Sequence, residues 1–101
     1  MKLDKIRTMI IELYETIDEI NLGVAKRIKL LRKRQKISQE KLSIKSGVSL
    51  GSIKRFETTG EISLKNLTKL ATALKCESDI RTLFSHIPYV SIEEVVNEKT
   101  R

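Results

Sequence analysis

The chain has 101 residues and a formal net charge of +7, and only 4% of its residues are aromatic. A chain of this length forms one domain with a single core, which here must consist mostly of Leu, Ile, Val and Ala. Its one cysteine excludes a disulfide framework and a cysteine-based zinc site, and its four glycines and one proline favour helices over many short strands.

The positive charge is concentrated in the middle of the chain. Residues 23–59 carry eleven basic and two acidic side chains, whereas residues 60–101 carry six of each. Such a block is typical of a protein that binds a polyanion, and a solvated basic surface without a partner is the alternative. The first residues form no uninterrupted apolar stretch, so we expect no signal peptide or spanning helix there, and a cytoplasmic protein.

Apolar residues recur every three or four positions near the N-terminus. They are Leu3, Ile6, Ile10, Leu13, Ile17 and Ile20. The spacing predicts an amphipathic helix of about four turns, which Asn21 and Gly23 interrupt or cap. Either this helix packs on its own domain or its narrow stripe contacts a second copy or another protein. We favour the intermolecular contact.

Apolar periodicity predicts five further helices. They are expected at residues 22–35, 39–46, 50–57, 64–74 and 79–84. The last four each follow a serine suited to the N-cap, namely Ser38, Ser49, Ser63 and Ser78. In the fourth helix we expect inward positions at Leu64, Leu67, Leu70, Ala71 and Leu74. A capping box from Ser91 to Glu94 predicts one or two more helical turns, or else a frayed end.

The segment from Ser38 to Glu57 carries the functional signal. Two short helices meet there through a sharp turn that favours Gly47. Burial of one side is expected at Leu42, Val48, Ile53 and Phe56. The opposite side of the second helix is then free to approach a DNA duplex, and the small residues at its start permit close contact.

Candidate DNA contacts lie on both short helices and in the turn before them. Arg55 is long enough to reach a guanine or a phosphate, and either Arg55 or Lys54 contacts a base. Gln39, at a helix N-terminus, suits a phosphate. Leu50 either touches a thymine methyl group or packs in a dimer. The predicted DNA-binding residues are Lys36, Gln39, Lys41, Lys45, Ser49, Leu50, Gly51, Ser52, Lys54 and Arg55.

This segment resembles the helix-turn-helix of Cro and lambda-repressor type regulators, the XRE family. The matching positions are Ser38-Gln39-x-x-Leu42, Gly47-Val48-Ser49, Ile53-x-x-Phe56-Glu57 and Gly60, flanked by Ile28-x-x-Leu31-Arg32 and Leu67-x-x-Leu70-Ala71-x-x-Leu74. The resemblance covers about residues 22–84. It implies an all-α, five-helix, lambda-repressor-like domain, here with an extra N-terminal amphipathic helix. It also implies a homodimer on a palindromic operator in double-stranded DNA, with the helix after Ser49 in the major groove.

A narrower resemblance connects residues 52–67, and the segment from Leu83 to Glu94, with HipB-like antitoxins. It implies a repressor of its own toxin-antitoxin operon that also binds a HipA-like serine/threonine kinase. The helix over Leu3–Ile20 is a departure from shorter members of that group. Two other functions stay open: a stand-alone or phage-type repressor, and a module that mainly binds a protein and has weak DNA affinity.

The sequence contains no pattern typical of an enzyme, such as a nucleophile with its base or a Gly-rich phosphate loop. His86 stands apart from other metal-ligating residues. We therefore expect no catalysis, cofactor or metal. We divide the chain into an N-terminal helix for dimer or partner contact at 1–21, a DNA-binding domain at 22–86 and a tail at 87–101.

Overall fold

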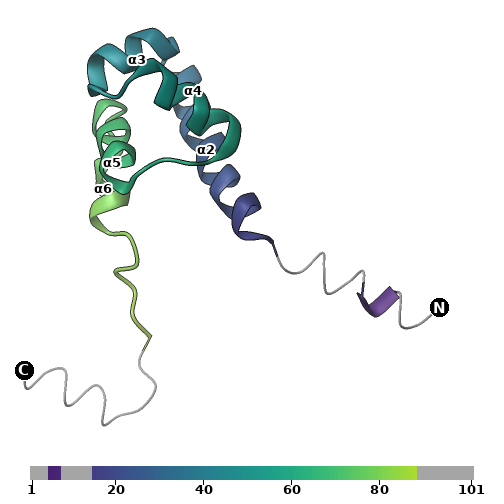
Figure 1. Cartoon of the computed structure of the whole chain (residues 1–101). Coiled ribbons are helices and arrows are strands. Elements are labelled where there is room, and N and C mark those ends of the chain that lie inside the picture. Colours follow the sequence, from purple (N-terminus) through teal and green to yellow (C-terminus); the bar gives the residue numbers. More distant parts are fainter. Residues whose placement is uncertain (1–4, 8–14, 89–101) are drawn as a thin grey trace, which may run out of the picture.

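The computed structural model describes residues 5–7 and 15–88, and these residues form helices and turns without a strand. The helices are α2 (Ile17–Arg34), α3 (Gln39–Ser46), α4 (Leu50–Thr59), α5 (Leu64–Ala73) and α6 (Glu77–Arg81). In Figure 1, α2 runs along one side of the domain, α5 and α6 lie on the other, and α3 lies across the top. This architecture confirms the predicted all-α, lambda-repressor-like fold class. No helix in the described part is long and apolar enough to cross a membrane.

Helix α2 begins before residue 22 and passes through the expected break without interruption. Thr16 Oγ1 accepts a hydrogen bond from the backbone N–H of Glu19 at 3.1 Å, and Glu19 Oε1 accepts one from the backbone N–H of Thr16 at 3.5 Å. The predicted interruption at Asn21 and Gly23 is therefore wrong. This upstream capping box fixes the start of α2, and one glycine inside a helix costs only about 1 kcal/mol. Positions 3, 10 and 13 of the N-terminal stripe lie outside the described residues.

The starts of α3, α4 and α5 confirm the predicted caps. The hydroxyls of Ser38, Ser49 and Ser63 each accept a hydrogen bond from the backbone N–H three residues later, at 3.0 to 3.1 Å. Gly47 ends α3 and Gly60 ends α4 in the left-handed conformation, with φ values of 75° and 81°. Serine caps and left-handed glycines thus fix the ends of both helices in the helix-turn-helix.

The predicted start of the last helix is wrong, because Ser78 does not cap it. After α5 the chain reverses at Lys75, whose φ is 61°, and the N–H of Cys76 donates to the carbonyl of Ala71 at 2.8 Å. This Schellman-type turn needs so few residues that α6 begins directly at Glu77. Ser78 therefore lies inside the first turn of α6. The capping box predicted at 91–94 lies outside the described residues.

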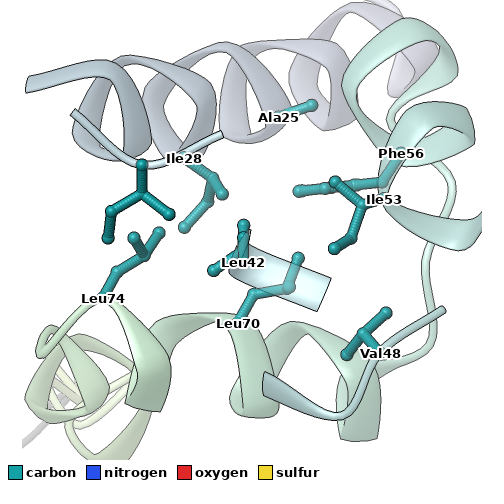
Figure 2. Close-up of a cluster of buried hydrophobic side chains, with 9 residues drawn as sticks. Ala25, Ile28, Leu42, Val48, Ile53, Phe56, Leu70 and Leu74 are labelled. Atoms are coloured by element: carbon teal, nitrogen blue, oxygen red, sulfur yellow. The ribbon is translucent and has the colours of Figure 1, made fainter. Parts of the chain in front are cut away.

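The core is a single cluster of apolar side chains from α2, α3, α4, α5 and the turns between them (Figure 2). Its members are Ala25, Ile28, Ile37, Leu42, Val48, Ile53, Phe56, Leu70 and Leu74. The four residues predicted to be buried in the helix-turn-helix are at most 2% exposed, which confirms that prediction. Leu64 was predicted to face inward, but it is 63% exposed because α5 reaches the core only one turn later, at Leu67.

The C-terminal end of α4 lies so close to α2 that position 60 has no room for a side chain. Gly60 is buried, and a Cβ atom there would lie only 2.8 Å from the backbone of Asn21 and Leu22. These two helices also pack more extensively than any other described pair. The direction of α4, and of the corner that follows it, is therefore set by backbone contact with α2.

Candidate DNA-binding surface

The turn between α3 and α4 is held by short hydrogen bonds. The Ser43 hydroxyl donates to the carbonyl of Val48 at 2.6 Å, and the N–H of Val48 donates to the Ser46 hydroxyl at 3.1 Å. The Val48 side chain is only 2% exposed and belongs to the core. Both the backbone and the buried side chain of the turn are thus fixed, which sets the angle at which α4 leaves α3.

The two sides of α4 differ sharply in burial. The inner side consists of Ile53, Phe56 and Glu57, all buried. The outer side exposes Gly51, Lys54 and Arg55, preceded by the exposed cap Ser49, and Leu50 and Ser52 are half-buried. Within the described chain, the outer side of α4 is therefore open to a ligand, as a helix that enters a groove of DNA must be.

The remaining predicted DNA contacts lie on α3 and in the turn before it. Lys41 and Lys45 are exposed on α3, and Lys36 is exposed in the turn with a φ of 57°. Neither of the ion pairs found in the described part of the chain involves these lysines. Their charge is therefore available to phosphates, and the neighbouring N-terminus of α3 adds a positive end of a helix dipole.

Gln39 belongs to a largely buried hydrogen-bond network that was not predicted from the sequence. Its Nε2 donates to Glu57 Oε1 at 3.0 Å. Glu57 also receives two hydrogen bonds from Arg32, one from Nε at 2.8 Å and one from Nη2 at 2.9 Å, and Arg32 Nη1 donates to the carbonyl of Ile37 at 2.8 Å. The network joins α2 to the N-terminus of α3 and the inner side of α4, and it fixes the position of the Gln39 amide.

The pKa of the Glu57 carboxyl reflects opposing causes. Burial by itself raises this pKa, but the hydrogen bonds from Arg32 and Gln39 and the positive charges of Arg32 and Lys29 outweigh it and bring the pKa below its usual value.

A sequence signal for the ion pair between Arg32 and Glu57 does exist. Arg32 follows Ala25 and Ile28 at helical spacing on the buried side of α2, and an acid at the inner position 57 requires a cation.

Arg55, which with Lys54 is one of the two candidates for base contact, is paired on the outer side of α4. Its Nε and Nη2 donate to Glu61 Oε2 at 3.1 and 2.6 Å, and the two side chains are 70% and 62% exposed. Glu61 lies in the corner between α4 and α5 and was not predicted as a site residue. The sequence gives no signal for this contact, because it depends on how Gly60 turns the chain.

An open groove of about 690 Å³ lies beside the outer side of α4. Ser52, Arg55 and Glu61 line one part of it, and the rest is lined by apolar side chains such as Val24 and Leu67 and by further polar residues, Asn21, Ser63 and Asn66. No group of three or more metal-ligating side chains gathers in the part of the chain that the structure describes. The polar groups next to α4 are thus suited to hydrogen bonds and to charge pairing.

Comparison with protein-family models gives a match to the family described as Helix-turn-helix, over residues 28–80. The matched span is just over half of the chain, and it runs from within α2 into α6. It therefore includes the complete α3–turn–α4 unit. No curated protein and no solved structure matched the chain.

Proposed function

The chain belongs to the Cro/C1-type helix-turn-helix family and is a DNA-binding transcription regulator, and we propose that it represses transcription as a homodimer bound to an inverted-repeat operator. The observation that carries this proposal is the open outer side of α4, with its small residues at the start and Lys54 and Arg55 one turn later. A side of this kind approaches base edges closely and still offers long donors for guanine or phosphate.

We assign separate tasks to the two groups of candidate residues. Base contacts, and therefore operator specificity, come from Ser49, Leu50, Ser52, Lys54 and Arg55. Phosphate contacts come from Lys36, Gln39, Lys41 and Lys45, because they lie on α3 and the turn before it. Affinity should then fall steeply with salt, since each neutralised phosphate releases counterions.

The operator proposal is tested by selection from a random library of DNA duplexes with the full-length protein. We expect an inverted repeat whose half-sites are about 10 base pairs apart, since a twofold dimer places its two α4 helices one DNA turn apart. Gel shift on a selected duplex should show one complex with two protein chains. Enrichment of no consensus would contradict the proposed function, and a single half-site would contradict the homodimer.

We infer that the start of α2 carries the contact between the two copies. Ile17 is 77% exposed and Ile20 is 50% exposed, and both belong to the apolar stripe of the N-terminal sequence. Exposed apolar side chains in helical register are typical of a helix–helix interface.

Analytical ultracentrifugation of the variant Ile17→Glu, Ile20→Glu tests this interface. Charges in the stripe should shift the protein toward monomer, while circular dichroism keeps its helical signal. Leu30→Glu is the matched control, because Leu30 is 48% exposed on α2 outside the stripe. Truncation before Thr16 preserves the α2 cap together with Ile17 and Ile20, so the truncated protein should still dimerise. A dimer that survives the double substitution would contradict this assignment.

For the partner, we propose a HipA-like kinase encoded beside this gene, so that the protein is the autoregulating antitoxin of that operon and works in the cytoplasm. Support comes from the sequence resemblance at residues 52–67 and from exposed apolar side chains after α6. Leu83, Phe84 and Ile87 are 48%, 86% and 63% exposed. The test is co-purification with the product of the neighbouring gene, which Phe84→Ser should weaken. A neighbouring gene that encodes no kinase would favour a stand-alone repressor.

A further inference from the structure

We propose that Glu61 is a positioning residue that presents the Arg55 guanidinium to a base, and thereby helps to set operator specificity. This inference rests on the proposed function, in which Arg55 contacts DNA. Its basis is a contact in which Glu61 Oε2 accepts hydrogen bonds from both Nε and Nη2 of Arg55, at 3.1 and 2.6 Å. An exposed pair of this kind contributes little to folding stability, so its effect must be sought at the DNA.

The contact leaves one particular edge of the guanidinium free. A guanidinium has five N–H donors arranged in a rigid fork. Glu61 accepts hydrogen bonds from the Nε–H and from one Nη2–H, which form the side edge of the guanidinium. Both Nη1 hydrogens and the second Nη2 hydrogen remain, and the end edge that they form is one that donates two parallel hydrogen bonds to guanine O6 and N7. Glu61 thus selects one orientation of Arg55 that is competent for bidentate contact.

Glu61 is itself held in place by a closed ring of hydrogen bonds. Its backbone N–H donates to Thr59 Oγ1 at 3.1 Å, and the Thr59 hydroxyl donates to the backbone carbonyl of Arg55 at 2.8 Å. The Glu61–Arg55 side-chain contact closes the ring. Gly60, between Thr59 and Glu61, is fixed against the backbone of α2. The carboxylate therefore approaches Arg55 from a rigid corner, which lowers the conformational entropy that Arg55 loses on binding.

The charge of Glu61 argues against a role in general affinity. Its side chain is 62% exposed beside the side of α4 that is proposed to face DNA, where a carboxylate would repel phosphates. A surface selected only for strong binding would not place an acid there. Repulsion of phosphates weakens binding to operator and non-specific duplexes alike, so Glu61 raises the ratio of the two affinities through the orientation of a base-contacting arginine.

Two substitutions separate charge from orientation. Glu61→Gln removes the charge but keeps an oxygen that accepts from Arg55, whereas Glu61→Ala removes both. Fluorescence anisotropy measures each protein on a duplex selected by the wild-type protein and on a scrambled duplex of equal composition. Both variants should bind the scrambled duplex more tightly. Only Glu61→Ala should lose about fivefold or more of the operator-to-scrambled ratio, a loss at the low end of that for one bidentate base contact.

A double-mutant cycle with Arg55→Ala identifies the path of the effect. If Glu61 acts through Arg55, then Glu61→Ala should leave the ratio unchanged once Arg55 is alanine. Repeated duplex selection should also show that Glu61→Ala and Arg55→Ala lose base preference at the same position. Thermal unfolding within a few degrees of the wild type establishes that the variants are folded.

The outcomes distinguish this inference from the proposed function. A wild-type protein without preference for any duplex contradicts both. A ratio that falls in Arg55→Ala but stays unchanged in Glu61→Ala overturns the positioning role and leaves the proposed function standing. An equal loss of the ratio in the Gln and Ala variants, or a loss that persists in the Arg55→Ala background, also overturns it.

Discussion

The inner and outer sides of α4 each carry one Arg–Glu pair, and the two pairs differ in almost everything except distance. On the inner side, Arg32 and Glu57 lie 2.8 Å apart, with side chains 9% and 3% exposed. On the outer side, Arg55 and Glu61 lie 2.6 Å apart, with side chains 70% and 62% exposed. The comparison teaches that burial, and not the distance between the charged atoms, decides how much such an ion pair contributes to folding stability.

On the inner side, water cannot replace a missing partner. Removal of one charge there leaves the other buried and unpaired, at a cost far above the net contribution of the intact pair. On the outer side, water solvates either charge alone, so the pair is dispensable for folding and its guanidinium can be given to DNA. Helix α4 therefore contributes one residue to a buried pair that stabilises the fold and one residue to an exposed pair that we propose for DNA contact.

The largest effect is expected from Glu57→Ala. The substitution leaves Arg32 buried without its carboxylate and removes the acceptor of Gln39, so unfolding in urea should show a loss of about 3–5 kcal/mol. Glu61→Ala is the matched substitution on the outer side. Equal losses for the two variants would refute the distinction between the pairs.

Alanine substitutions at the two left-handed glycines test the close contact between the end of α4 and the backbone of α2. Gly60→Ala places a Cβ 2.8 Å from the α2 backbone, whereas Gly47→Ala has no atom within 4 Å of its Cβ. Both lose about 1–2 kcal/mol from the left-handed conformation, and Gly60→Ala loses about 1–3 kcal/mol more from crowding. Urea unfolding curves should separate them, and a cost at position 60 no greater than at position 47 would contradict the close packing of α4 on α2.

Acid should weaken the inner pair selectively. Folding lowers the pKa of the Glu57 carboxyl from its usual value of 4.5. The ionised carboxylate therefore contributes its full stabilisation above pH 4.5, and this contribution is lost as the pH falls through the lower pKa of the folded protein. Unfolding free energies at pH 7 and in acid should therefore differ more for the wild type than for Glu57→Gln, which cannot titrate at this position. Identical pH profiles would mean that the carboxylate is not stabilised in the folded state.

The smallest effect on stability is expected from Glu61→Ala itself. An exposed ion pair contributes about 0–1 kcal/mol, and salt screens it further. The unfolding midpoint in urea should therefore shift little at low salt and even less in 0.5 M salt, a concentration of roughly the size that shortens the screening length to a few ångströms. A loss as large as 3 kcal/mol would place the outer pair in the same class as the inner one.

The sequence predicted most of the fold because its signals are local. Ser38, Ser49 and Ser63 each act through a hydrogen bond to a backbone three residues away, and glycine permits the left-handed ends of α3 and α4. The start of α2 was missed although Thr16 and Glu19 form a recognisable capping box, because the N-terminal apolar spacing was extended through it. The cap predicted at Ser78 was wrong because the turn after α5 uses only three residues, so α6 begins at Glu77 and places Ser78 inside its first turn.

The candidate site was predicted less completely, because its contacts cross between elements. The open outer side of α4 followed from the positions of Ile53 and Phe56, whose burial determines which side remains free. The partners of Gln39 and Arg55 did not follow. The first depends on how the start of α3 packs beside α4, and the second on a corner whose direction is set by contact between Gly60 and the α2 backbone.

The central claim is that the outer side of α4 binds the operator, and Arg55→Ala measured against Arg81→Ala tests it most directly. Both variants remove one exposed arginine, but Arg81 lies on α6, away from α4 in the fold. On a duplex selected by the wild-type protein, fluorescence anisotropy should show a loss of about 1–3 kcal/mol in binding free energy for Arg55→Ala. Arg81→Ala should bind as the wild type does. Equal affinities for the two variants would contradict the claim.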